Sequence, residues 1–152
     1  MNKFKIYFKS ILVPVLIGAV IGLVISSSMD YNSLQKPTLA PPSLVFPIVW
    51  TILYILMGVS YGILKSNDLI SQDINTIYGI QLFFNALWPI AFFILKWRLF
   101  AFVWIICLAL LVGYMVYKFY EKNKLSGLIQ LPYLVWTVFA SYLNIAIYLL
   151  NK

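Results

Sequence analysis

The chain has 152 residues, of which 63% are hydrophobic and 10% are charged, against roughly 25% charged in soluble domains, so its composition excludes a water-soluble globular protein. The net charge of +7 comes from basic residues scattered between apolar runs, which is not the clustering typical of nucleic-acid binding, so no nucleic-acid partner is expected. Histidine is absent and Cys107 is the only cysteine, which excludes a disulfide framework and a Cys/His metal site within one chain, and we expect no metal or cofactor.

Five apolar segments are long enough for helices that cross a bilayer, each of which needs roughly 20 residues. They are residues 11–27, 45–64, 74–95, 99–117 and 125–150. None contains Asp, Glu, Lys or Arg, as expected where a charge is costly. We therefore predict an all-α fold, with one five-helix transmembrane domain over residues 1–152 in a lipid bilayer.

The first segment, 11–27, follows three lysines and precedes a run of serines, so a cleaved signal peptide is an alternative interpretation. Small residues recur at every fourth position: Pro14, Gly18, Gly22 and Ser26. They would line one helix face for close packing. This face favours a helix that is retained.

A proline-rich loop, 28–44, separates the first two segments. Four of the seven prolines crowd there and just beyond it, at positions 37, 41, 42 and 47. Proline fixes its own φ and restricts the unfolded chain, which lowers the entropy cost of ordering the loop. We predict a stiff lid over a membrane cavity, with a passive connector as the alternative.

The second, third and fifth segments carry aromatic and amide side chains at helical spacing. The sets are Trp50 with Tyr54, Gln81 with Asn85 and Trp88 nearby, and Trp136 with Ala140 and Asn144. Amides facing lipid would stay unpaired, so these faces should point inward and form an aromatic cleft. Bonds that only hold the helices together are the alternative for the amides. With no ionisable group inside the segments, a conventional acid/base site is not expected.

Basic residues predict the orientation. Most lie before the first segment or in the second and fourth loops, whereas Lys36, Lys96, Arg98 and Lys152 fall on the other side. By the positive-inside rule the N-terminus is cytoplasmic, and the lid and C-terminus share the opposite side. We expect a bacterial-type plasma membrane.

Three motifs carry a resemblance to a known family: KPTLAPPSLVFPIVWTILYILMGVSYG, QLFFNALWPIAFF and LPYLVWTVFASYLN. Together they resemble the translocator protein family, also called tryptophan-rich sensory proteins or peripheral benzodiazepine receptors, from about Gly18 to Asn144. The resemblance implies a five-helix membrane protein, commonly a homodimer, that binds protoporphyrin IX, sterols or isoquinoline carboxamides under its first loop. It also implies light-dependent degradation of protoporphyrin IX, with Trp50 and Trp136 as the candidate catalytic residues.

The resemblance carries the ligand site over to particular positions. They are Tyr31, Pro41, Pro42, Trp50, Asn85, Trp136, Phe139, Ala140 and Leu143. Phe46, Tyr54 and Trp88 complete the candidate ligand-binding set. Asp30 and Leu39 depart from the family pattern, in which many members carry tryptophan at both places.

Near the end of the chain, Leu143, Tyr148 and Lys152 match a weak sterol motif, for which an interfacial tyrosine and a snorkelling lysine are the alternative. We predict a membrane receptor for porphyrins and related hydrophobic ligands. The alternatives are a facilitative transporter of tetrapyrroles or other amphiphiles, and a regulatory membrane partner protein.

Overall fold

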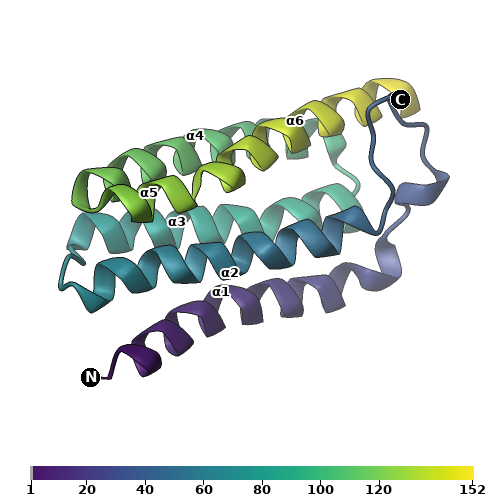
Figure 1. The fold of residues 1–152 in the computed structure, drawn as a ribbon. Coiled ribbons are helices and arrows are strands. Elements are labelled where there is room, and N and C mark those ends of the chain that lie inside the picture. Colours follow the sequence, from purple (N-terminus) through teal and green to yellow (C-terminus); the bar gives the residue numbers. More distant parts are fainter. Residues whose placement is uncertain (1) are drawn as a thin grey trace.

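The computed structural model describes residues 2–152, which are helical and contain no strand (Figure 1). The α-helices are α1 (Lys3–Ile25), α2 (Val45–Ser66), α3 (Gln72–Pro89), α4 (Arg98–Lys122), α5 (Lys124–Ile129) and α6 (Leu131–Asn151). One 3-10 turn, Ser26–Ser28, follows α1 directly, and a second, Tyr31–Ser33, lies in the lid. A π-helical turn, Ile90–Ile94, extends α3. Five helical segments are long and apolar enough to cross a membrane, which confirms the predicted all-α class.

Local capping explains where several helices begin. The Asn2 side chain accepts a hydrogen bond from the Phe4 amide at 2.7 Å, so α1 starts at Lys3, well before the expected 11–27 segment. Ser71 caps α3 in the same way through the amide of Ile74. The expected 125–150 segment is divided into α5 and α6 at Gln130, because Pro132 has no amide hydrogen and fits only the first turn of a new helix.

The end of α3 widens into a π-helical turn directly after Pro89. A π turn adds a residue to the helical ladder, which shifts the direction in which successive side chains point. Phe92 and Phe93 are both buried as a result. The turn ends at Ile94. Lys96, two residues later, has a φ of 56°, in the left-handed region that non-glycine residues seldom adopt.

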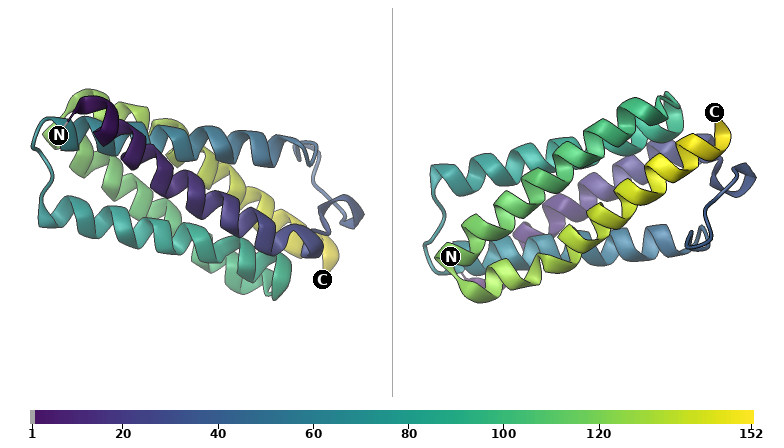
Figure 2. Two further views of the ribbon diagram at one scale, coloured as in Figure 1. Left: turned by 90° about the horizontal axis from the view of Figure 1, so that it is seen from below. Right: turned by 90° about the horizontal axis from the view of Figure 1, so that it is seen from above.

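The helices form one bundle in which α1 runs obliquely across α2 and the end of α3 (Figures 1 and 2). The helices α1 and α2 approach most closely at Gly58, where an added Cβ would lie 2.3 Å from the Ile11 Cα. Away from this crossing α1 diverges, and no atom of residues 2–152 outside the local helix lies within 4 Å of a Cβ built on Gly22. The predicted close packing of the small face is therefore wrong for Gly22, which borders open space instead.

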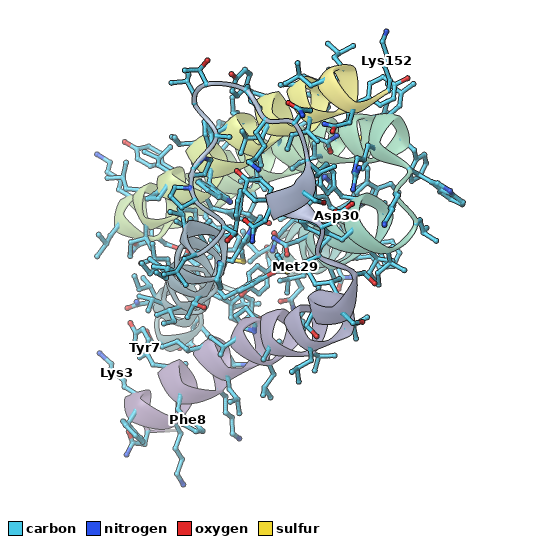
Figure 3. The ribbon with its side chains drawn as sticks, turned by 90° about the vertical axis from the view of Figure 1, so that its right-hand side faces the viewer. Lys3, Tyr7, Phe8, Met29, Asp30 and Lys152 are labelled. Atoms are coloured by element: carbon cyan, nitrogen blue, oxygen red, sulfur yellow. The ribbon has the colours of Figure 1, made fainter. Side chains whose placement is uncertain are left out.

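The lid and the C-terminus lie at one end of the bundle, opposite the N-terminus (Figure 1). Seen from that end, Met29 and Asp30 lie between α1 and the other helices (Figure 3). The lid therefore covers the region where α1 has moved away from the bundle.

Candidate functional site

A cleft of about 680 Å³ opens beneath the lid, between α1, α2, the α3 end and α6. Eight of the predicted ligand-binding residues line it: Tyr31, Phe46, Trp50, Tyr54, Asn85, Trp88, Ala140 and Leu143. These residues belong to elements that are far apart in the sequence, and the helix bundle brings them together around one cleft. Its lining is predominantly apolar and aromatic, as is usual for small-molecule sites.

Four predicted residues do not line the cleft. Pro41 and Pro42 lie in the lid, where the Pro41 carbonyl accepts a hydrogen bond from the Tyr31 hydroxyl at 2.6 Å. Trp136 and Phe139 border a second, more open groove between α2 and α6. The Trp136 ring nevertheless packs against Phe46 at 5.8 Å, so it supports the cleft wall from behind.

The weak sterol motif is divided in the same manner. Leu143 lines the cleft, whereas Tyr148 and Lys152 do not. Lys152 is exposed at the end of the chain described. The three positions therefore do not line one cavity.

Sequence reasoning missed one whole wall of the cleft. The α1 contribution comes from Val15, Gly18, Ala19, Ile21, Gly22 and Ile25, and the π turn adds Phe92 and Phe93. The spacing of small residues along α1 indicates this face, but the same spacing is typical of a contact between helices. The divergence of α1 depends on where it crosses α2, which no local pattern encodes.

The floor of the cleft is a chain of buried hydrogen bonds. The Tyr54 hydroxyl donates to Asn85 Oδ1 at 2.5 Å, and Asn85 Nδ2 donates to the Tyr133 hydroxyl at 2.7 Å. Tyr133 in turn donates to Gln81 Oε1 at 2.7 Å. Both amides thus point into the bundle, where each finds the partners that hydrocarbon would not supply.

A third amide, that of Asn144, stabilises the side wall. The Trp88 indole donates to Asn144 Oδ1 at 2.9 Å, and Asn144 Nδ2 donates to the Arg98 carbonyl at 2.8 Å. The side-chain oxygen and nitrogen atoms of Asn85 and Asn144 all form hydrogen bonds within the protein. The amides of Asn85 and Asn144 are therefore not free to bind a ligand, and aromatic rings make up much of the remaining lining.

The lid is ordered by a group of contacts around Tyr31, which is only 4% exposed. Its ring packs edge-on against Phe46 at 4.8 Å. The Lys36 ammonium donates to the carbonyl oxygens of Tyr31 and Leu34 at 3.0 and 3.1 Å. Burial raises the pKa of the Tyr31 phenol above its ordinary value, so this group remains a hydrogen-bond donor at neutral pH.

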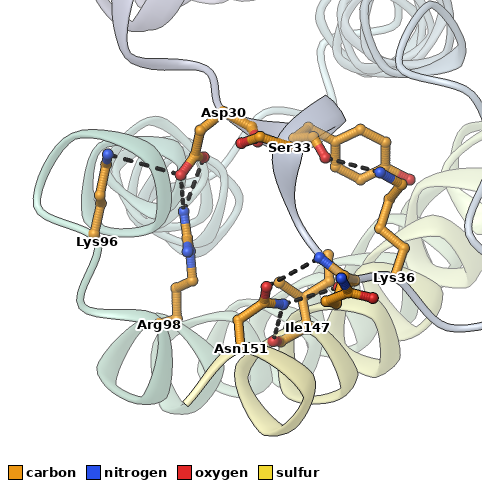
Figure 4. Close-up of polar contacts among 9 residues, drawn as sticks. Asp30, Ser33, Lys36, Lys96, Arg98, Ile147 and Asn151 are labelled. Carbon is orange, nitrogen blue, oxygen red and sulfur yellow. Dashed lines mark hydrogen bonds and ion pairs between the residues drawn. The ribbon is translucent and has the colours of Figure 1, made fainter.

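Two links fasten the lid to the bundle (Figure 4). Both carboxylate oxygens of Asp30 accept from Arg98 Nη2, at 2.8 and 2.7 Å, and Lys96 Nζ lies 3.7 Å from Asp30. At the second link, the Gln35 amide donates to Asn151 Oδ1 at 2.9 Å, and Asn151 Nδ2 donates to the Gln35 carbonyl at 2.8 Å. An ion pair thus holds the lid at the position where the family pattern would place tryptophan.

Within residues 2–152, no cluster of three or more His, Cys, Asp or Glu side chains is arranged to hold a metal ion. The polar groups of the cleft are amides, hydroxyls and indoles. Such groups bind and orient a ligand, and they include no conventional acid/base pair.

Comparison with known proteins gives a consistent match along the chain. A family model described as the TspO/MBR family matches residues 10–150. The chain is 38% identical over 154 residues to the tryptophan-rich protein TspO of Archaeoglobus fulgidus, an alignment that covers 99% of both chains. It is 35% identical over 128 residues to the protein of the same name in Chlorobaculum tepidum, covering 82% of this chain and 81% of that one. With the translocator protein of Sus scrofa it shares 30% identity over 126 residues, covering 80% and 75% respectively.

Proposed function

The chain belongs to the TspO/MBR family, and from this premise we propose that it is a membrane receptor for protoporphyrin IX and related hydrophobic ligands. The observation that carries the proposal is the aromatic cleft of about 680 Å³ beneath the lid. Its size falls within the range of roughly 300–1,000 Å³ typical of small-molecule sites. Isoquinoline carboxamides and sterols are the related ligands that the resemblance implies.

The cleft suits a flat, largely apolar molecule. Trp50, Tyr54 and Phe46 provide rings on the α2 side, and Trp88 and Phe92 provide rings on the α3 side. Ring faces and edges attract an extended π-system through dispersion and quadrupole interactions. Opposite them, α1 contributes Gly22, where open space remains for the body of a ligand.

The direct test is a titration with protoporphyrin IX in the dark, followed by quenching of tryptophan fluorescence. Ala140→Leu and Gly22→Leu should each fill part of the cleft and weaken binding. Ala146→Leu is the matched control, because Ala146 lies on the same helix as Ala140 but does not line the cleft. Saturable binding that weakens only in the two cleft variants is the expected result.

Equal affinity in all three folded variants would place the ligand elsewhere and contradict the proposal. Non-saturable quenching that is identical in every protein would mean that the porphyrin partitions into detergent. In that case the partner-protein alternative would be favoured.

The floor of the cleft favours a receptor over a facilitative transporter. Passage through the centre of the bundle would have to cross the hydrogen-bonded layer of Asn85, Tyr133 and Gln81, all of which are buried. Proteoliposomes loaded with porphyrin should therefore lose it no faster than protein-free liposomes. Faster, saturable efflux would support the facilitative transporter.

Assembly and orientation complete the proposal. The protein is proposed to be a homodimer in a bacterial-type plasma membrane, with its N-terminus in the cytoplasm. The orientation is supported by the basic residues near the N-terminus and around Lys118, Lys122 and Lys124. Bound porphyrin is proposed to be degraded in light, which is supported by the position of Trp50 in the cleft wall.

A further inference from the structure

We call the end of the cleft that the lid covers its mouth. Arg98 lies beside this end, where it contacts Asp30 of the lid, but it does not line the cleft. Its guanidinium carbon is 5.0 Å from the centre of the Phe92 ring, and Phe92 belongs to the cleft wall. Its partner Asp30 sits between Met29 and Tyr31, which both line the cleft. The side chain of Arg98 is only 12% exposed, so the ion pair is partly shielded from solvent.

Asp30 uses only part of the bonding capacity of Arg98. A guanidinium carries five N–H donors on three nitrogens and binds a carboxylate best through two different nitrogens. Here both carboxylate oxygens meet Nη2 alone. Nε is buried and has no hydrogen-bond partner among residues 2–152. Arg98 therefore retains a desolvated donor that a better-placed anion could engage.

The charge around the mouth favours an anion. Four basic side chains occur in the lid, from the α3–α4 connection to the first residue of α4, and at the C-terminal end. They are Lys36, Lys96, Arg98 and Lys152. Asp30 is the only acidic side chain in the same segments. Lys96 lies 3.7 Å from the carboxylate that Arg98 binds, so two cations converge on one position (Figure 4). Convergent positive charge raises the local concentration of anionic ligands.

We propose that Arg98 and Lys96 form an anion site at the mouth of the cleft that binds the carboxylate of an amphiphilic ligand, and that Asp30 of the lid competes for this site. The apolar body of such a ligand would lie in the cleft, with its acid group at the rim. The assignment rests on the proposed function of the cleft. It adds that the preferred ligands carry a carboxylate, and that binding them releases one of the two links of the lid.

The test compares protoporphyrin IX, which has two carboxylates, with its dimethyl ester, which has the same ring and no charge. Both are titrated in the dark in nanodiscs of phosphatidylcholine. We expect the acid to bind wild-type protein more tightly than the ester, by roughly five- to tenfold for a charge-assisted contact at a partly exposed site. Arg98→Gln should remove this preference, so that the acid and the ester bind with the same affinity.

Asp30→Asn provides a second, independent variant. It removes the competing carboxylate but keeps Arg98, so the ratio of acid to ester affinity should rise above the wild-type value. Lys152→Gln removes one positive charge at the same end of the molecule and is the control. Its ratio should match wild type, because Lys152 forms no ion pair with any residue from 2 to 152.

The outcomes separate this inference from the proposed function. If acid and ester both bind saturably with the same affinity in all four proteins, the anion site is wrong and the cleft receptor stands. If neither ligand binds saturably, the receptor itself is wrong. A parallel series in nanodiscs containing phosphatidylglycerol should keep the preference for the acid. Its loss would mean that a lipid headgroup takes the site, which would overturn the ligand assignment.

Discussion

Trp50 lies where the cleft wall meets the aromatic core. Its ring centre is 5.8 Å from that of Tyr54, 6.3 Å from that of Tyr133 and 6.4 Å from that of Trp136. Only Trp50 and Tyr54 of these four residues border the cleft. The two tryptophans that the resemblance treats as a pair therefore have unequal access to a ligand.

This difference predicts unequal roles in light. A photoexcited porphyrin oxidises a nearby indole directly or through oxygen, so proximity should decide which indole reacts. Trp50→Phe should lose most of the light-dependent product formation, and Trp136→Phe should retain more of it. Absorbance of the porphyrin under controlled illumination measures the rate, after both variants have been shown to bind in the dark. A greater loss in Trp136→Phe would contradict this ranking.

Asn85 has a structural role that can be separated from any ligand contact. Replacing it with leucine would leave the hydroxyls of Tyr54 and Tyr133 each without one buried partner. We expect Asn85→Leu to destabilise the protein by about 1–2 kcal/mol. The measurement is unfolding in detergent, followed by circular dichroism.

The matched comparison is the double variant Tyr54→Phe and Asn85→Leu, which also removes the hydroxyl that loses its Asn85 acceptor and keeps the hydrogen bond from Tyr133 to Gln81. Its stability should recover part of the loss, because the Tyr54 hydroxyl is no longer buried without a partner. A double variant less stable than Asn85→Leu alone would mean that the unpaired Tyr54 hydroxyl is not the cause of the loss.

The sequence predicts the direction and the partners of some side chains better than those of others. The inward direction of Gln81 and Asn85 follows from their chemistry, since an unpaired amide is costly in lipid. Their partner Tyr133 was not predicted, because a tyrosine at that position fits an interfacial anchor equally well. The i, i+4 spacing puts Trp136 and Ala140 on one helix face, yet Ala140 lines the cleft and Trp136 borders the second groove.

At the scale of elements, the crossing of α1 and α2 determines the shape of the cleft. Gly58 allows the two backbones to meet at Ile11, and beyond that contact α1 diverges to form the open wall. The crossing is close because Gly58 has no side chain. The width of the cleft therefore depends on a glycine that does not line it.

Gly58→Ala should consequently affect both stability and binding. The new Cβ would lie 2.3 Å from Ile11 Cα and 2.7 Å from the Ser10 carbonyl oxygen, so the backbone of α1 would have to shift. We expect a loss of about 1–3 kcal/mol, as is usual for overpacking, together with weaker porphyrin binding. Gly79→Ala is the control, because a Cβ at Gly79 would have no neighbour within 4 Å in the part of the chain that the structure describes, apart from its own helix. If both variants behave like wild type in unfolding and titration, the crossing does not control the cleft.

The existence of the helices was easier to predict than their geometry. Hydrophobic length gave the five membrane-crossing segments, but it cannot detect the N-cap at Asn2 or the break before Pro132. Nor did it predict the π turn after Pro89, which brings Phe92 and Phe93 to the cleft. These features depend on individual hydrogen bonds, to which average hydrophobicity is insensitive.

For the whole molecule, an odd number of spans places the two termini at opposite ends (Figure 1). The lid lies at the C-terminal end, where Gln35 and Asn151 exchange two hydrogen bonds. A ligand that enters beneath the lid therefore comes from the side of the membrane that faces the C-terminus. Which compartment that is depends on the orientation of the whole bundle.

The positive-inside rule predicts that this side is not the cytoplasm. Single cysteines placed in a Cys107→Ser background can test the orientation with a membrane-impermeant maleimide on intact cells. Leu39→Cys, at a lid position that is 70% exposed, and Lys152→Cys should be labelled. Lys5→Cys and Lys122→Cys should react only after permeabilisation, because they lie at the opposite end. The reverse pattern would put the cleft mouth in the cytoplasm, and labelling of Leu39→Cys and Lys152→Cys from different sides would contradict the fold itself.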